Sequence, residues 1–305
     1  MQTLIIIFVC LAIGLICQRI PRFPVSIYKK LNKFIIYFCL PAITLYFIPK
    51  VKWQSDLIYP IAAAWISFAF SILFFSVLGS IFKWSKKLTG ALIISAGFAN
   101  TSFLGFPIIE ALYGKSGLKT AVLVDQPGCF VVLSTFGVLV AILHSKGSTT
   151  AGQLLKKILL FPPFMAFAIA MGMSILDYDF FDLLQEGLKE IGNLITPLAL
   201  FAVGLQLSFD RKSKHFPFLT LGLLFKLILM PLLIFLLYGL VFKQSGPQIE
   251  ISVLEMAMAP MISACIIAAS YGLKPRLCTM MIGFGIPISF VTIALWYVLL
   301  KYVGI

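Results

Sequence analysis

The sequence predicts an all-α membrane protein with ten transmembrane helices in two inverted five-helix repeats. Three observations indicate this fold: the composition, the alternation of basic loops, and landmarks that recur at a nearly constant spacing. Of the 305 residues, 61% are apolar and 11% are charged, whereas a soluble domain averages about 45–50% and about 25%. This composition argues against a soluble enzyme, a nucleic-acid-binding module and a disulfide-stapled secreted protein.

Membrane-spanning helices appear in a sequence as apolar runs of about 20 residues. The first five are expected at 2–18, 34–49, 58–82, 89–113 and 120–143, and the second five at 158–176, 191–209, 218–242, 251–271 and 277–303. The second and sixth runs are short for a hydrocarbon core of about 30 Å, so they are expected to thin the bilayer or to be buried by neighbours. The first run lacks a basic lead and a small-residue cleavage site, so we expect it to be retained as a span.

The placement of Lys and Arg supports these spans and predicts their orientation. Basic residues are enriched in cytoplasmic loops. One set of alternate loops holds 16 of the 24 basic residues, the other set with the C-terminus holds seven, and Lys226 lies inside the eighth run. We therefore expect a multi-pass protein of the plasma membrane with both termini outside.

Recurring landmarks predict an internal repeat. A five-helix unit has an odd number of spans, so its second copy must lie upside down. Offsets of 153 to 158 residues separate three pairs of landmarks: Pro41 and Pro197, Pro107 and Pro260, and Tyr113-Gly114 and Tyr271-Gly272. These offsets predict repeats at 1–148 and 149–305. Inverted repeats are typical of secondary transporters, which bind substrate near the midplane where paired helices are broken.

The fourth and ninth helices are predicted to be broken at prolines. Proline lacks an N–H and clashes with the carbonyl four residues earlier, so Pro107 would release the Phe103 carbonyl and Pro260 the Met256 carbonyl. Freed carbonyls need partners, so such breaks persist in buried or wet sites. Each break also starts a half-helix whose N–H groups favour an anion. The alternative is a tolerated kink, since other prolines also fall in predicted spans.

Several segments resemble the auxin efflux carrier family. Its fourth-span pattern of Asn-Thr, Gly-x-Pro and Tyr-Gly is similar to three groups in this sequence: Asn100-Thr101, Gly105-Phe106-Pro107 and Tyr113-Gly114. The segments at 31–41, 122–126 and 257–272 resemble the family's second, fifth and ninth spans, so the likeness runs along essentially the whole chain.

The resemblance implies a permease whose fourth and ninth helices cross at their breaks and hold an organic anion. It also implies a homodimer in which spans one, two, six and seven form a scaffold for a moving, elevator-like domain. Family substrates include auxin in plants and carboxylates such as malate or malonate in bacteria. Many plant members have a long loop between the repeats, whereas only 144–157 joins them here. The chain therefore resembles the compact microbial branch, and auxin is not expected to be its physiological substrate.

Candidate substrate-binding residues gather at the two predicted breaks. The carboxylate of the substrate is expected between the half-helix N-termini, where Asn100, Thr101 and Gln126 would hydrogen bond to it. Ser102 is a further polar side chain at the first break. The motif residues complete the predicted substrate site: Gly105, Pro107 and Pro260.

Four ionisable residues fall inside predicted spans, where such groups usually mark pathways or paired sites. Glu110, Asp125 and Glu255 lie within about five residues of an outer helix end, so they are alternatively explained by contact with interfacial water. Lys226 is deeper, and a purely structural role would require a buried acidic partner or a neutral amine. Asp125 or Glu255 is expected to carry a proton or cation that offsets the substrate's charge, with Lys226 as a further charge-compensating group.

Enzymatic chemistry is not expected. The histidines, His144 and His215, lie in predicted cytoplasmic loops, and the six cysteines lie in apolar stretches without a C-x-x-C pair, so neither a metal site nor a cofactor is predicted. Membrane lipid and a small anion are the expected partners, and nucleic acid is not. Three alternatives remain. A sodium-coupled symporter of bile-acid-carrier-like architecture would place cation-ligating acids and carbonyls beside both breaks. A membrane-embedded enzyme would need a convergent catalytic cluster, and a structural or receptor-like bundle would have no reason to break two equivalent helices.

Overall fold

The computed structural model describes residues 2–21, 23–24, 26–50, 57–145, 159–160, 162–206 and 215–304. Within these ranges the chain is helical, and one isolated antiparallel bridge joins Ala99 to Pro260. Six described helices are long and apolar enough to cross a membrane: Ile27–Lys50, Ile58–Ile81, Thr101–His144, Asp182–Leu205, Phe216–Val241 and Pro275–Val303. Shorter apolar helices lie at Val9–Arg19 and Phe164–Ile175. The protein is therefore all-helical and polytopic.

The helices follow one another with many wide π-helical turns, labelled η. The N-terminal part contains the following elements: α1 (Gln2–Arg19), α2 (Ile27–Phe34), η1 (Ile35–Cys39), α3 (Leu40–Phe47), the tight turn η2 (Ile48–Lys50), α4 (Ile58–Ile81), α5 (Lys86–Gly97), η4 (Thr101–Gly105), α6 (Phe106–Leu123), η5 (Val124–Phe130), η6 (Leu133–Gly137) and α7 (Val138–His144).

The C-terminal part contains its own series of helices: α9 (Pro162–Ile175), α10 (Asp182–Asn193), α11 (Ile195–Gln206), α12 (Phe216–Leu224), η7 (Phe225–Leu229), α13 (Met230–Phe235), η8 (Leu236–Val241), α14 (Pro247–Met256), α15 (Ile262–Ser270) and α16 (Pro275–Val303). The expected start of the sixth run at 158 and the expected end of the seventh at 207–209 lie outside the described residues, as does most of the stretch at 144–157.

Two predicted spans differ from the structure. The second was expected to be short, but α2 to η2 form one helix of 24 residues. Its first turns carry Lys29, Lys30 and Lys33, whose long stems keep the ammonium groups in water while the helix continues. The second difference is α10, an amphipathic helix that begins before the expected seventh run. Hydropathy did not predict this helix, because it mixes leucines with four charged residues.

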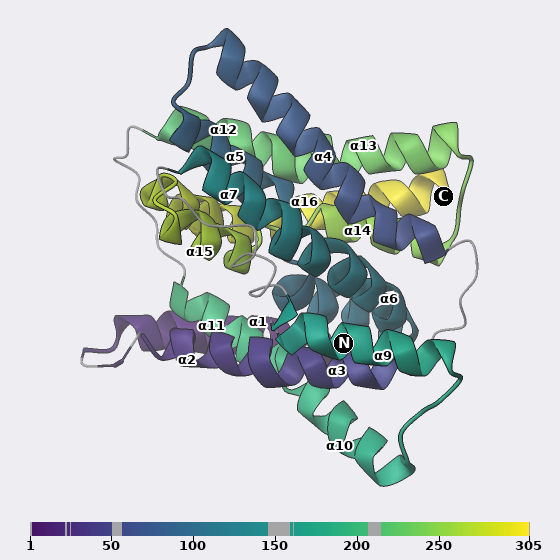
Figure 1. Ribbon diagram of the computed structural model, residues 1–305. Coiled ribbons are helices and arrows are strands. Elements are labelled where there is room, and N and C mark those ends of the chain that lie inside the picture. Colours follow the sequence, from purple (N-terminus) through teal and green to yellow (C-terminus); the bar gives the residue numbers. More distant parts are fainter. Residues whose placement is uncertain are drawn as a thin grey trace.

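The helices form two layers (Figure 1). One layer contains α1, α2, α3, α9 and α11, with α10 packed on α3 at its outer face. The other contains α4, α5, α7 and the helices from α12 to α16, and α6 lies between the layers. The helical stretch from Thr101 to His144 has 44 residues and consists of two helices joined at a non-helical residue. It bends at Gly114, whose φ of 67° lies in the left-handed region.

The first layer is held by a close backbone contact between α1 and α11. A Cβ atom on Gly204 would lie 2.9 Å from the Cα of Gly14 and 3.0 Å from the backbone N of Leu15. Glycine at both positions therefore lets the two helices approach more closely than side chains would allow. Small residues at such contacts are a common way of packing membrane helices.

We expect Gly204→Ala to destabilise the protein by about 1–3 kcal/mol, because the added methyl group overlaps backbone that cannot move aside. The matched control is Gly172→Ala in α9, where a Cβ atom would meet no atom within 4 Å and helix propensity favours alanine. Thermal melting of the purified protein in detergent measures both variants. Equal melting temperatures for the two variants would show that the α1–α11 contact is looser than described.

Candidate functional site

Two interrupted helices meet in the interior of the protein. The chain leaves helical conformation at residues 98–100, between α5 and η4, and at 257–261, between α14 and α15. The backbone N–H of Asn100 donates to the carbonyl of Ala259 at 2.8 Å, and the N–H of Met261 donates to the carbonyl of Phe98 at 3.1 Å. Pro260 occupies the bridge position between them, and having no N–H it leaves no donor unpaired there. The two breaks thus share their backbone hydrogen bonds.

The first break lies seven residues before the predicted proline. Pro107 lies inside the helical stretch that starts at Thr101, where the wide turn η4 runs directly into α6. Asn100 determines the break instead, because its Oδ1 accepts from the N–H of Phe103 at 3.3 Å and caps the new half-helix. Asparagine is among the preferred residues for this role. The expected release of the Phe103 carbonyl by Pro107 therefore does not account for this break.

The second break occurs at its predicted proline. The carbonyl of Met256, which Pro260 was expected to release, accepts a hydrogen bond from Nζ of Lys226 at 2.8 Å. Lys226 lies in η7 and is 0% exposed. The ion pairs within 4.0 Å among the described residues are Lys50–Asp179 and Lys301–Glu250, so the deep ammonium is held by a carbonyl of the break rather than by direct contact with an acid.

Asp125 organises the polar side chains at the first break. The hydroxyl groups of Thr101 and Ser102 both donate to its Oδ1 at 2.5 Å. The amide of Gln126 donates to its Oδ2 at 2.6 Å. Asp125 lies in η5 and is 0% exposed, so its carboxylate does not reach interfacial water. The structure therefore brings Thr101 and Gln126 to one carboxylate, since both donate to Asp125.

Glu255 approaches the same half-helix from the second break. It lies in the last turn of α14, is 0% exposed, and packs its carboxylate against the backbone of Gly105. A Cβ atom at Gly105 would overlap the Glu255 carboxylate, which gives the glycine of the motif a physical reason. Glu255 also interacts electrostatically with Asp125 and Lys226. Because Glu255 is fully buried, its carboxylate does not contact interfacial water. Glu110 is only partly buried, so that explanation stays open for it.

Several polar atoms at the breaks are buried without a hydrogen-bond partner in the described part of the chain. These are Nδ2 of Asn100, Oε1 of Gln126 and both carboxylate oxygens of Glu255. A buried polar group left unpaired costs about 1–3 kcal/mol, so clusters of such groups mark places where a ligand or ion binds. Sequence reasoning named all three residues, and their proximity depends on the pairing of the two breaks.

Contacts at the far ends of the half-helices hold the two breaks in register. The hydroxyl of Tyr113, in α6, donates to Oε2 of Glu250, in α14, at 2.5 Å. Lys301, in α16, pairs with the same oxygen at 2.6 Å. α16 also passes directly over the second break, since a Cβ atom at Gly285 would lie 2.6 Å from the Pro260 ring. The site is therefore built on packed helices rather than on loops.

Long apolar helices that bury charged side chains at paired interruptions define a class of polytopic membrane transport proteins. The family described as membrane transport protein matches residues 1–297. The chain belongs to this family, that of the auxin efflux carriers, which confirms the resemblance seen at Asn100-Thr101 and the motif that follows.

Two archaeal proteins are similar to this chain, and both are described as uncharacterised transporters. The protein of Methanocaldococcus jannaschii is 24% identical over 275 residues, which cover 88% of each chain. The protein of Methanothermobacter thermautotrophicus is 27% identical over 220 residues, which cover 70% of this chain and 68% of the relative. Members of such families generally move solutes rather than catalyse reactions.

Proposed function

We propose that this protein is a secondary transporter that moves a small organic anion, a carboxylate, across the plasma membrane by elevator-type alternating access. The observation that carries the proposal is the cluster of unpartnered buried polar atoms where the two breaks pair. An amide donor, Asn100, and an acid, Glu255, face this cluster from different halves of the chain. Substrate sites in secondary transporters have this arrangement.

The proposed architecture has ten spans in two inverted repeats, 1–148 and 149–305. Each half supplies one broken helix, and the antiparallel bridge between Ala99 and Pro260 suits two copies related by a two-fold axis. Both second half-helices end at a Tyr-Gly pair in which the glycine is left-handed, with φ of 67° at Gly114 and 71° at Gly272. The layer of α1, α2, α3, α9 and α11 corresponds to the proposed scaffold, and a homodimer with outside termini completes the proposal.

Substrate binding would begin at Asn100. Its Nδ2 lacks a partner within the described residues, and the neighbouring half-helix N-terminus favours negative charge. Thr101 and Gln126 would join Asn100 only when Asp125 releases their hydrogen bonds. A proton on Asp125 weakens its competition for these donors, because a neutral carboxyl is a poorer acceptor than a carboxylate. Binding of the anion and binding of a proton would thus favour each other.

Charge balance also requires a positive partner for the substrate. Asp125, Glu255 and Lys226 are all 0% exposed, and when ionised they sum to one negative charge. A carboxylate entering this buried site adds another, which is strongly unfavourable without a proton or cation. We infer that the partner is a proton taken up by Asp125 or Glu255. The Lys226 ammonium already binds the Met256 carbonyl, a group that a sodium ion would otherwise use.

The direct experiment is uptake by purified protein in liposomes across a panel of mono- and dicarboxylates that includes malate and malonate. An inward proton gradient and an inward sodium gradient are applied separately. Uptake driven by the proton gradient is the expected result. Uptake that depends on sodium alone would instead support the sodium-coupled symporter, and failure of every carboxylate would remove the proposed substrate class.

We expect Asn100→Asp to reduce anion uptake at least about tenfold. The aspartate keeps the oxygen that caps the half-helix but replaces the free amide donor with a negative charge, and a hydrogen bond to a charged group is worth about 1.5–3 kcal/mol. The matched control is Asn32→Ala in α2, which removes another buried unpartnered group outside the helices that form the breaks. Initial uptake rates should fall for Asn100→Asp alone. Full activity of Asn100→Asp would refute the site.

A further inference from the structure

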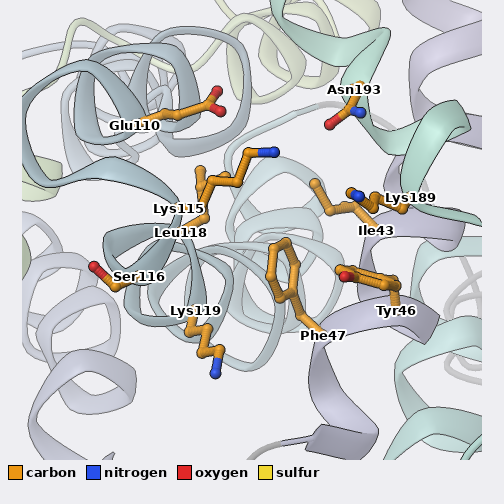
Figure 2. A pocket seen from close by; sticks show the side chains of 10 residues that line it. All are labelled: Ile43, Tyr46, Phe47, Glu110, Lys115, Ser116, Leu118, Lys119, Lys189 and Asn193. Carbon is orange, nitrogen blue, oxygen red and sulfur yellow. The ribbon is translucent and has the colours of Figure 1, made fainter. Parts of the chain in front are cut away.

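A second cavity lies between the two layers, away from the paired breaks. It has a volume of about 290 Å³ and lies between α6 on one side and α3 with α10 on the other (Figure 2). This volume is close to the lower end of small-molecule sites, about 300 Å³. We call it the lysine vestibule, after the three lysines that line it: Lys115, Lys119 and Lys189.

The charge of the lysine vestibule is strongly one-sided. Three lysines line it against one acidic residue, Glu110. Figure 2 shows Lys115 reaching across the cavity toward Asn193, while Lys119 points away from its centre. Lys50, which interacts electrostatically with Lys119 and Lys189, adds a fourth cation nearby, and Asp179 pairs with it at 3.8 Å. A cleft lined by one sign of charge concentrates ions of the opposite sign.

Apolar and aromatic side chains also line the lysine vestibule. Ile43 and Phe47 of α3 and Leu118 of α6 line it, together with the ring of Tyr46. The ligand that fits both the lysines and the apolar side chains is an anion with a small apolar body, which is the chemistry of an organic carboxylate. Inorganic anions would use the lysines and leave the apolar side chains without a contact.

One helix, α6, begins just after the first break and supplies residues to the lysine vestibule. Lys115 lies ten residues after Gly105, directly after the non-helical Gly114. Glu110 lies between them, more than one turn closer to the break. We propose that the lysine vestibule is an initial binding site for the transported organic anion, which then passes along α6 to Asn100. This inference rests on the proposed function. It also gives α10 a role, since this helix supplies Lys189 and Asn193.

The kinetic test uses malonate uptake in liposomes of phosphatidylcholine, which carries no net charge. Lys115→Gln and Lys189→Gln should each raise the KM about twofold to fivefold and leave Vmax unchanged, as expected for partly exposed charges. Glu110→Gln should lower the KM, because it removes the repelling charge. Lys30→Gln, an exposed lysine in α2, is the control and should change neither constant. Unchanged KM values in both vestibule variants, with Asn100→Asp inactive, would overturn this inference while leaving the proposed function intact.

A binding test does not depend on transport. Malonate should protect Lys115 and Lys189 from acetylation by acetic anhydride, as measured by mass spectrometry, and should leave Lys30 unprotected. Asn100→Asp should retain this protection, since its change lies at the break. Absence of protection by malonate, or protection only by vesicles that contain anionic lipid, would overturn the inference even if malonate is not transported.

Discussion

Lys226→Met is expected to abolish transport and to destabilise the protein by about 3–5 kcal/mol, because it leaves a buried charge uncompensated. Methionine fills a similar volume but cannot donate to the Met256 carbonyl, which Lys226 binds at 2.8 Å. The second break then has an unpaired carbonyl, and the negative charges of Asp125 and Glu255 have no buried cation beside them. Both consequences act on the same region of the site.

Thermal melting and uptake together measure this prediction. Adding Glu255→Gln to Lys226→Met should recover part of the lost stability, because it removes one of the uncompensated charges, and it should not recover uptake. Lys29→Met, at an exposed position in α2, controls for the loss of a lysine as such. A Lys226→Met protein with unchanged melting temperature would show that the ammonium is not needed at the break.

Asp125→Asn is expected to eliminate proton-driven uptake while the protein remains folded. The asparagine keeps an oxygen that accepts from Thr101 and Ser102, which donate to Asp125 at 2.5 Å, but it cannot take up a proton. Exchange of labelled for unlabelled anion across the membrane needs no net proton movement, so exchange should persist. Accumulation against a gradient should fall to background.

Asp125→Ala provides the contrasting variant. It removes the acceptor of three buried donors, and each unpaired group costs about 1–3 kcal/mol, so exchange and stability should both be lost. Asp179→Asn, at the partly exposed pair with Lys50, should leave exchange and accumulation unchanged. Proton-driven accumulation by Asp125→Asn would show that the proton is carried elsewhere, with Glu255 as the next candidate.

Local sequence features predicted much of the fold. Apolar runs identified helices such as α4 and α16, because length and hydropathy are properties of the segment alone. The break at Pro260 followed from its missing N–H. The break at residues 98–100 was predicted at Pro107, seven residues too late. The asparagine that caps Phe103 is as local a signal as a proline, and it marks the observed position. The helix α10 was missed because its charged residues lower its hydropathy.

The internal connections of the site depended on tertiary structure. The sequence identified Asp125, Glu255 and Lys226 as unusual, but it left contact with interfacial water open for the two acids, because each lies within about five residues of a predicted outer helix end. Packing against other helices buries all three completely. The partnership of Lys226 with the Met256 carbonyl joins residues 30 positions apart, and no spacing rule predicts it.

The shared backbone hydrogen bonds between residues 98–100 and 259–261 have a mechanical consequence. In the proposed transport cycle, neither segment can withdraw from the bound anion without breaking hydrogen bonds to the other, so we expect the two breaks to move together. In the proposed elevator mechanism, the substrate is therefore expected to reach either side of the membrane when both breaks shift together against the layer of α1, α2, α3, α9 and α11.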